Sequence, residues 1–381
     1  MSTGRADGAP DRAPILLTPG PLTTPDSVRR AMLRDWGSRD ADFIALMARL
    51  RRRLAALVHA EDSHVCVPMQ GSGTFAIEAA LGSLLGRTSK LLILINGAYG
   101  RRMARICERI GQRYAVLEGP EDEPASLREI VQALDADSAI RELALVHCET
   151  TSGILNPLSQ VAELAAERGC GLIVDAMSSF GGLPIDARAE RFDALIASAN
   201  KCLEGAPGLS FVIVRRSLLE ACAGNAPSLS LDLYEQWRGF EANGQWRFTP
   251  PTHVAAALDA ALDALAAEGG VAARSARYGA NCRTLIAGMH SLGFVPLLRE
   301  DLQAPVIVTF REPADPRYDF VRFYEALTRR GYAIYPGKLT AAPSFRIGCI
   351  GAVGVREMEG VVEAVRGALK ELGITQTGPR A

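Results

Sequence analysis

The sequence has no excess of charge of either sign. Its 381 residues include 42 basic and 43 acidic side chains, which leaves a formal net charge of −1. Proteins that bind nucleic acids or anionic membrane surfaces electrostatically normally carry a basic patch or a basic overall balance. We therefore expect neither a nucleic acid nor a membrane among the partners, and we interpret the arginine-rich segment 49–53 as a solvated helix face.

Long apolar runs are missing as well. No stretch reaches the roughly 18 apolar residues that a membrane-spanning helix needs, and no hydrophobic segment of the signal-peptide kind occurs at the N-terminus. These absences predict a cytoplasmic protein. Hydrophobic residues still make up 48% of the chain, which is ordinary for a globular protein and enough for two domains that share an interface.

The eight cysteines lack any spacing that suggests a metal site or a disulfide framework. No C-x-x-C pair occurs, and several cysteines lie within apolar strand patterns. We interpret them as reduced thiols of the core and expect no bound metal.

What the sequence does contain is a regular alternation of short apolar strands and amphipathic helices. Strands that are apolar along their whole length are buried on both faces, which is typical of a parallel sheet between two helical layers. The expected strands are 64–69, 91–95, 114–117, 143–147, 171–175, 194–198 and 211–214. The pattern predicts an α/β fold with a large domain built on a mostly parallel, seven-stranded sheet.

The last third of the chain has a different organisation. After a polar stretch at 224–250, two long helical patterns lead into a smaller unit of alternating strands and helices. The expected elements are helices 253–268, 271–292, 318–330 and 355–372 and strands 305–310, 332–336 and 344–350. We predict four regions, namely a disordered tail 1–13, a large domain 14–260, a small C-terminal α+β domain 261–372 and a flexible tail 373–381.

The first candidate for ligand binding is the segment "MQGSGTFAIEAAL" at 69–81, where a strand gives way to a helix. Ser72, Gly73 and Thr74 bring backbone N–H groups and hydroxyls to the positive end of a helix dipole, which suits a phosphate dianion. The same residue types also begin helices that bind nothing, as simple caps. Both interpretations stay open for this segment on its own.

A second candidate, Asp175, ends the apolar run "GLIVD". Ligands of α/β sheets bind at the carboxyl ends of the strands, so a carboxylate there faces the ligand crevice. Burying the charge without a cationic partner is costly. The alternative is a structural aspartate that caps the following turn.

Lys201 is the third candidate, and it lies in the small, apolar setting "SANKCL" after the next expected strand. Since neighbouring strand ends meet at one edge of the sheet, we expect Lys201 and Asp175 to converge. Pyridoxal 5'-phosphate needs a helix N-terminus for its phosphate, a carboxylate for its pyridinium nitrogen and an amine for its aldehyde. The three candidates together therefore predict a pyridoxal-phosphate enzyme. A nicotinamide site is not indicated, because the G-x-G-x-x-G spacing is absent.

The sequence as a whole resembles the 2-aminoethylphosphonate:pyruvate aminotransferases, a group of class V enzymes of pyridoxal-phosphate fold type I. The resemblance covers residues 14–370 and rests on a combination of segments. They include "TPGPLTTP", "QGSGTFAIEAALG", "NGAYGRR", "HCETTSGILNPL", "VDAMSSFGGLPID", "SANKCLEGAPG" and "GQWRFTPPTHV". The pattern differs at Arg39, Pro227 and residues 341–345, none of which belongs to the cofactor set.

The resemblance implies a role for each matching residue. Lys201 would bind the aldehyde of the cofactor and Asp175 its pyridinium nitrogen, while Tyr99 would stack on the ring and Thr150 would contact the hydroxyl edge. The phosphate would be held by Ser72, Gly73, Thr74 and Asn200, and by Thr249 of a neighbouring subunit. Each active site would then belong to a homodimer. A core aromatic, turn residues and caps are the structural alternatives for these positions.

The implied substrates are 2-aminoethylphosphonate and pyruvate, and Arg346 of "SFRIG" is the residue expected to bind both. A planar guanidinium matches two oxygens of either a phosphonate or a carboxylate. The alternative for Arg346 is a surface salt bridge. Gly20 and the "TPGP" loop are expected to line the same pocket, and Arg34 and Arg39 are candidates for a second cationic contact to the phosphonate.

Other functions have to be weighed against this one. An alanine–glyoxylate or serine–pyruvate aminotransferase would share every cofactor residue and differ in its substrate. A cysteine desulfurase would need a nucleophilic cysteine on a loop, whereas Cys349 lies in an expected strand. A non-catalytic ligand-binding relative has no need to keep the lysine, the aspartate and the phosphate site together. Whether the phosphonate is broken down or made is left open by the sequence.

Overall fold

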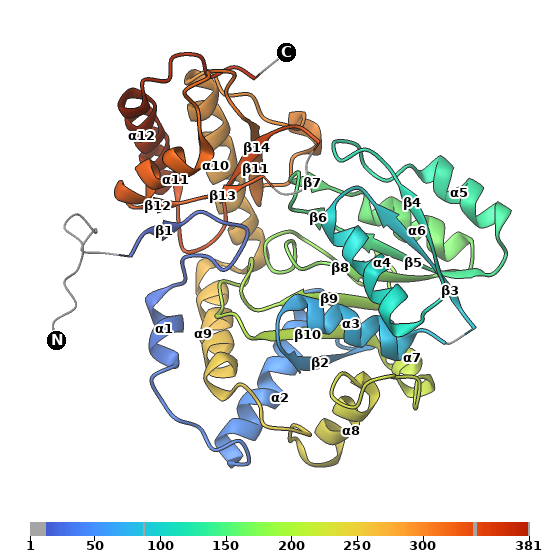
Figure 1. Ribbon diagram of the computed structural model, residues 1–381. Coiled ribbons are helices and arrows are strands. Elements are labelled where there is room, and N and C mark those ends of the chain that lie inside the picture. The colour runs from blue at the N-terminus through green and yellow to red at the C-terminus, as the bar shows by residue number, and fades with distance from the viewer. Residues whose placement is uncertain (1–12, 87, 338–340, 380–381) are drawn as a thin grey trace.

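The computed structural model describes residues 13–86, 88–337 and 341–379, and a central sheet with helices on both faces dominates it (Figure 1). The sheet has seven strands in the order β2-β10-β9-β8-β5-β3-β4. They are β2 His64–Gln70, β3 Lys90–Ile95, β4 Tyr114–Glu118, β5 Ile140–Val146, β8 Gly171–Asp175, β9 Ala194–Ser198 and β10 Leu209–Arg215. Within this sheet only β10 runs antiparallel to its neighbours. The predicted α/β fold with a mostly parallel, seven-stranded sheet is confirmed.

Side chains of successive strand residues point to opposite faces, and both faces are buried. In β5, Leu143 and Leu145 join one hydrophobic cluster, whereas Ala144 and Val146 join the other. The helices that pack mainly on the first cluster are α2 Ala41–Ala56, α5 Leu127–Ala136, α6 Leu158–Glu167 and α9 Thr252–Glu268. Those on the second are α3 Gly73–Leu84, α4 Ala98–Ile110, α7 Arg216–Ala221 and α8 Leu233–Asn243. This double coverage explains why the strands read as unbroken apolar runs.

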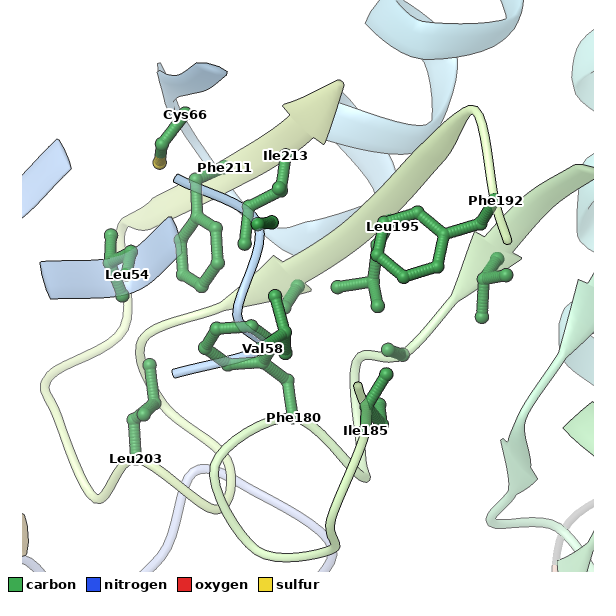
Figure 2. Close-up of a cluster of buried hydrophobic side chains, with 14 of the residues drawn as sticks. Leu54, Val58, Cys66, Phe180, Ile185, Phe192, Leu195, Leu203, Phe211 and Ile213 are labelled. Carbon is green, nitrogen blue, oxygen red and sulfur yellow. The ribbon is translucent and has the colours of Figure 1, made fainter. Parts of the chain in front are cut away.

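Aromatic rings fill part of the first cluster beneath β9 and β10. Figure 2 shows Phe180 and Phe211 close together there, and their ring centroids lie 5.1 Å apart at an edge-to-face angle of 70°. Phe180 belongs to the loop that follows β8, so this packing ties the loop after Asp175 to the underside of the sheet. The strand ends that carry the candidate residues are thus supported by a dense core.

The polar stretch at 224–250 contains a helix that the sequence pattern did not reveal. Helix α8 buries Leu233 and Trp237 against α3 and β2. Its side-chain cap is formed by Asp232, which accepts a hydrogen bond from the backbone N–H of Glu235 at 3.0 Å. Few apolar residues are enough here, because a short helix on the outer edge of a cluster covers little area.

The C-terminal part contains a second, three-stranded sheet in the order β11-β14-β13. Its elements are β11 Ile307–Arg311, β13 Tyr335–Pro336, β14 Ser344–Gly348, α10 Gly270–Ser291, α11 Phe320–Arg329 and α12 Val355–Leu372. The single strand expected at 332–336 is instead two short strands with different partners. β12 Tyr332–Ala333 pairs with the N-terminal β1 Ile15–Leu16, and β13 pairs with β14. Figure 1 shows this part, with β1 beside it, above the main sheet.

The C-terminal part has its own hydrophobic cluster, which includes Phe310, Phe345 and the N-terminal Leu17. The domain limits 14–260 and 261–372 stay a prediction, and residues 1–12 of the expected N-terminal tail lie outside the described ranges. Beyond α12, Ile374 is buried and the Thr377 hydroxyl donates to the Leu292 carbonyl at 2.6 Å. The described residues after α12 therefore pack on this part of the molecule. The remaining short elements are α1 Asp26–Ala31, β6 Cys148–Glu149, β7 Ile154–Leu155 and the 3-10 helix Glu300–Leu302.

None of the helices in the described ranges is long and apolar enough to cross a membrane. No group of three or more His, Cys, Asp or Glu side chains in those ranges is arranged to hold a metal ion. All eight cysteines are free thiols, and Cys170 is the only one that is not buried.

Candidate active site

The carboxyl ends of β8 and β9 and the start of α3 open onto one cavity of about 330 Å³. Eight of the residues singled out in the sequence line this cavity: Gly20, Ser72, Gly73, Thr74, Tyr99, Asp175, Asn200 and Lys201. They come from separate motifs, and the parallel arrangement of the strands brings their ends to one edge of the sheet.

The start of α3 faces the cavity with a hydroxyl that the helix does not use. Ser72 occupies the cap position in an extended conformation, but its side chain makes no capping hydrogen bond. A Cβ atom added to Gly73 would lie 2.4 Å from the sulfur of Met177, so glycine permits a close approach of the two segments. The interpretation of this segment as a simple side-chain cap is therefore not supported.

Asp175 is almost fully buried at the end of β8, with 5% of its surface exposed. One carboxylate oxygen accepts a hydrogen bond from the backbone N–H of Met177 at 2.9 Å. Burial raises the pKa of Asp175 to about 7, and the Met177 N–H and the charges of Arg102 and Lys201 only partly counteract this effect. Since the turn uses one of two carboxylate oxygens, the capping role and a ligand-binding role are compatible.

Lys201 reaches the cavity from the loop after β9. Its ammonium group donates hydrogen bonds to the carbonyl oxygens of Pro19 at 2.5 Å and Gly20 at 3.4 Å. Gly20 has a φ of +107°, and a Cβ atom there would lie 2.6 Å from the Cδ atom of Lys201. Glycine is thus needed at position 20 both for the backbone conformation and for space beside the lysine.

Tyr99 is held by a residue that the sequence reasoning missed. The carboxylate of Glu149 is fully buried and accepts hydrogen bonds from the Tyr99 backbone N–H at 2.9 Å and the Thr151 hydroxyl at 2.6 Å. A Cβ atom on Gly97 would lie 2.3 Å from the Glu149 Cδ atom, so the first turn of α4 sits directly against the carboxylate. Burial raises the pKa of Glu149, and these hydrogen bonds oppose the shift. An acidic residue inside the apolar run around "HCETT" was the available signal.

Arg346 lies on β14 and is 97% buried, with 3% of its surface exposed. Its guanidinium donates to the carbonyl oxygens of Thr150 at 2.9 Å and Pro336 at 3.0 Å, and burial lowers its pKa. No carboxylate of the described residues forms an ion pair with it, so the surface salt bridge is ruled out for that part of the chain. The Thr150 hydroxyl is buried without a hydrogen-bond partner among the same residues.

Arg102 is a second residue that the sequence reasoning missed. It lines the cavity, and its guanidinium donates a hydrogen bond to the Thr74 hydroxyl at 3.0 Å. The signal for it was its position in "NGAYGRR", three residues after Tyr99, because residues at this spacing share one face of a helix. Its guanidinium carbon lies 4.8 Å from the centroid of the Tyr99 ring.

Five residues from the sequence-based set are not among those that line this cavity: Thr150, Arg346, Thr249, Arg39 and Arg34. Thr249 is exposed and lines a separate cavity together with Arg39. Arg34 is exposed and pairs with Asp42 at 3.3 Å. The predicted contacts of Thr249, Arg34 and Arg39 stay predictions.

The cysteines offer no nucleophile in this cavity. Cys349 is fully buried in the C-terminal part, where a hydrogen bond with Cys282 and burial raise its pKa well above the ordinary value. Cys148 lines the cavity, but burial raises its pKa well above the ordinary value as well. Both groups are therefore neutral thiols at ordinary pH, and neither has the thiolate character of a desulfurase nucleophile.

Curated relatives resemble this chain over almost its whole length. It is 54% identical over 368 residues to the 2-aminoethylphosphonate–pyruvate transaminase 2 of Burkholderia lata, covering 97% of this chain and 98% of the relative. A 2-aminoethylphosphonate–pyruvate transaminase of Pseudomonas aeruginosa strain PAO1 is 53% identical over 366 residues, or 96% of this chain and 99% of the relative.

Solved structures agree with this relationship. The alanine–glyoxylate aminotransferase of a Nostoc species superposes with a TM-score of 0.88 at 26% identity, over 96% of this chain and 97% of that one. The pyridoxamine–pyruvate aminotransferase of Mesorhizobium loti gives 0.87 at 26% identity, over 96% and 95%. The family model described as aminotransferase class-V matches residues 28–355. The chain therefore belongs to the class V aminotransferases, in the branch that contains the 2-aminoethylphosphonate–pyruvate transaminases.

Proposed function

We propose that the chain transfers the amino group of 2-aminoethylphosphonate to pyruvate with pyridoxal 5'-phosphate as cofactor, giving phosphonoacetaldehyde and L-alanine. The observation that carries this proposal is the convergence of Lys201, Asp175 and the start of α3 in one cavity. The names of the relatives at 53–54% identity supply the substrates. The reaction belongs to phosphonate metabolism.

The residues present fit pyridoxal phosphate. Its phosphate would lie at the start of α3, on Ser72, Gly73 and Thr74, where a helix N-terminus favours an anion. Asn200 lines the same cavity and Tyr99 offers its ring. The buried Thr150 hydroxyl, which lacks a partner in the described part of the chain, matches a ligand group with hydrogen-bonding capacity.

The buried carboxylate of Asp175 is suited to a cationic group of a ligand in this cavity. Burial raises its pKa, because the residues around it offset the desolvation of the charge only in part. A protonated ring nitrogen placed against it would supply the missing cation, and the aspartate would in turn keep that nitrogen protonated. When bound, pyridoxal phosphate supplies an electron sink for the bond that is broken at the substrate carbon.

Lys201 has two tasks in this proposal. Its amine would hold the cofactor through the aldehyde, and its Nζ atom would serve as the base for the proton on the amine-bearing carbon of the donor. The carbonyl oxygens of Pro19 and Gly20 hold the Nζ atom at the cavity wall. They restrict where the base can be when the proton moves.

Arg346 is the proposed residue for the anionic end of both substrates. The donor carries a phosphonate and the acceptor a carboxylate, and one guanidinium can pair with either group in turn. Two carbonyl oxygens already orient this guanidinium. The contact with the Thr150 carbonyl joins the C-terminal sheet directly to the β6 segment beside the cavity.

We further propose that two subunits share the active sites. Thr249 lies outside its own cavity and is exposed, as a residue that serves a neighbouring subunit would be. Two large apolar side chains are exposed near the segments concerned, Phe75 beside the phosphate site and Phe248 beside Thr249, each with 50% of its surface accessible. Large exposed apolar groups are commonly covered in an interface.

Donor specificity is the test of the reaction. The purified protein is assayed with three pairs of substrates. They are 2-aminoethylphosphonate with pyruvate, alanine with glyoxylate, and serine with pyruvate. We expect the phosphonate to have the highest kcat/KM. A preference for alanine with glyoxylate or for serine would overturn the substrate assignment while leaving the cofactor assignment intact.

Covalent trapping separates an enzyme from a non-catalytic ligand-binding relative. Borohydride reduction of the protein with bound cofactor, followed by peptide mapping, should place the label on Lys201. Lys90, which forms an ion pair with Asp137 away from the cavity, serves as the internal control. Label on Lys90, or none on Lys201, contradicts the assignment of Lys201.

A further inference from the structure

Arg102 differs in its surroundings from the arginine beside it on α4. Arg101 is paired with Glu118 at 2.7 Å on the surface. Arg102 instead turns into the cavity, and no carboxylate of the described residues forms an ion pair with it. Its guanidinium donates a hydrogen bond to the hydroxyl of Thr74 at 3.0 Å. A guanidinium placed in a cavity with so little negative charge in direct contact is well suited to an anionic ligand.

The hydrogen bond from Arg102 orients the hydroxyl of Thr74. A hydroxyl has one donor hydrogen and two acceptor lone pairs. Because the Arg102 N–H occupies an acceptor position, the Thr74 O–H remains as a donor for another oxygen. Thr74 lies in the first turn of α3, where the positive end of the helix dipole already favours an anion.

Tyr99 limits where Arg102 can move. Its ring centroid lies 4.8 Å from the guanidinium carbon, within the range of a cation–π contact. The carboxylate of Glu149 holds the Tyr99 backbone in turn. The guanidinium is thus confined between the Tyr99 ring and the Thr74 hydroxyl, at the side of the cavity where α3 begins.

From this placement we propose that Arg102 binds the phosphate of the cofactor, pairing with it directly while orienting the Thr74 hydroxyl toward it. The inference rests on the proposed use of pyridoxal phosphate and adds a cationic residue to the predicted phosphate site. Arg346 is the separate guanidinium for the substrate anion. Its guanidinium donates to the carbonyl oxygens of Thr150 and Pro336.

The experiment compares two ligands that differ only in the phosphate. Cofactor-free wild-type and Arg102→Gln proteins are titrated with pyridoxal 5'-phosphate and with pyridoxal, and binding is followed by absorbance. We expect Arg102→Gln to raise the Kd for the phosphorylated ligand roughly tenfold or more, as for a lost charge-assisted hydrogen bond. The Kd for pyridoxal should stay the same.

Two further variants complete the comparison. Arg105→Gln removes an exposed arginine from the next turn of the same helix and should change neither Kd. Arg102→Lys keeps a positive charge without the planar fork, so it should lose less affinity than Arg102→Gln. It also keeps the test valid if Arg102→Gln fails to fold.

Several outcomes would overturn the proposal. An equal loss for both ligands means that Arg102 supports the cavity through Tyr99 and not through a phosphate. An unchanged Kd for both, with a raised KM for the phosphonate donor, assigns Arg102 to the substrate. A failure of the proposed reaction would look different, because wild-type protein would then bind the cofactor in an Arg102-dependent manner but would not use 2-aminoethylphosphonate.

Discussion

At the scale of single residues, Asp175 shows how a functional group can lower the stability of the cofactor-free protein. The pKa of Asp175 is raised by burial from 3.8 to about 7. Folding therefore favours the protonated form, so the contribution of this group to stability is fully present below about pH 4 and is lost as pH rises through 7. The cost at alkaline pH is on the order of 1–4 kcal/mol.

Asp175→Asn should consequently have opposite effects on stability and on activity. An amide cannot be ionised, so we expect the cofactor-free variant to unfold at higher denaturant concentration than the cofactor-free wild type at pH 8, with little difference at pH 4. The same variant should bind cofactor and lose most of its turnover, because a neutral amide does not keep the ring nitrogen protonated. Urea unfolding at both pH values and steady-state kinetics measure the two effects. Wild-type turnover in Asp175→Asn would refute the proposed role.

At the scale of the elements, the site depends on a close approach between the start of α3 and the turn after β8. The Cβ atom of Gly73→Ala would meet the flexible end of the Met177 side chain. A flexible side chain can move, so the fold should survive and the displaced Met177 should intrude on the cavity that it lines. We expect a loss of cofactor affinity of about 1–3 kcal/mol, the usual cost of overpacking.

A second substitution provides the matched comparison for Gly73→Ala. Shortening the neighbour in the double variant Gly73→Ala/Met177→Ala should restore most of the cofactor affinity. Gly119→Ala is the control, because nothing lies within 4 Å of the Cβ position there. If the double variant binds cofactor as weakly as Gly73→Ala alone, the clash with Met177 is not the cause.

The limits of sequence reasoning are also visible at this scale. The long apolar strands and helices were predicted closely, since both faces of the sheet are buried and every strand residue contributes to the pattern. The segment 332–336 was not, because β12 and β13 are two residues each and take their partners from β1 and β14. Pairing partners so distant in the chain leave no trace in a local apolar pattern.

At the scale of the whole molecule, Arg346 depends on the packing of the C-terminal sheet against the segment after β5. Arg346→Lys would replace a planar, two-carbonyl contact by a single charge. We expect kcat/KM to fall for both 2-aminoethylphosphonate and pyruvate. The loss of transition-state stabilisation should be about 1.5–3 kcal/mol for each, the scale of a charge-assisted hydrogen bond. Single-turnover kinetics of the two half-reactions measure them separately.

The exposed Arg366, on α12 of the same C-terminal part, supplies the control. Arg366→Lys should leave both half-reactions unchanged. Were Arg346→Lys to impair only the pyruvate half-reaction, the phosphonate would have to be bound elsewhere. Arg34 and Arg39 would then be the next candidates.

The proposed sharing of sites between subunits is the second prediction at this scale. Thr249→Ala should weaken cofactor binding by about 1 kcal/mol or somewhat more. In a mixed dimer of Thr249→Ala and Lys201→Ala subunits, the subunit with an intact Lys201 would receive Thr249 from its partner. At limiting cofactor the mixed dimer should therefore show the activity of one normal active site. Cofactor affinity as weak as in the Thr249→Ala homodimer would show that Thr249 serves its own subunit.

The sequence by itself determined the parts of this protein that local chemistry specifies. Unbroken apolar strands predicted the sheet with helices on both faces. Lys201, Asp175 and the residues at the start of α3 all lie at or just after the ends of such strands. The carboxyl ends of parallel strands meet at one edge of a sheet, so their convergence could be expected without coordinates.

Tertiary structure alone decided how the site is completed. Glu149 reaches the first turn of α4, Arg102 donates to Thr74, and Arg346 crosses from the C-terminal sheet to the Thr150 carbonyl. Each of these contacts joins residues that are well separated in the chain, and their geometry follows from how helices and sheets pack. A residue's chemical type is written in the sequence, whereas the group that its side chain meets is set by packing over the whole fold.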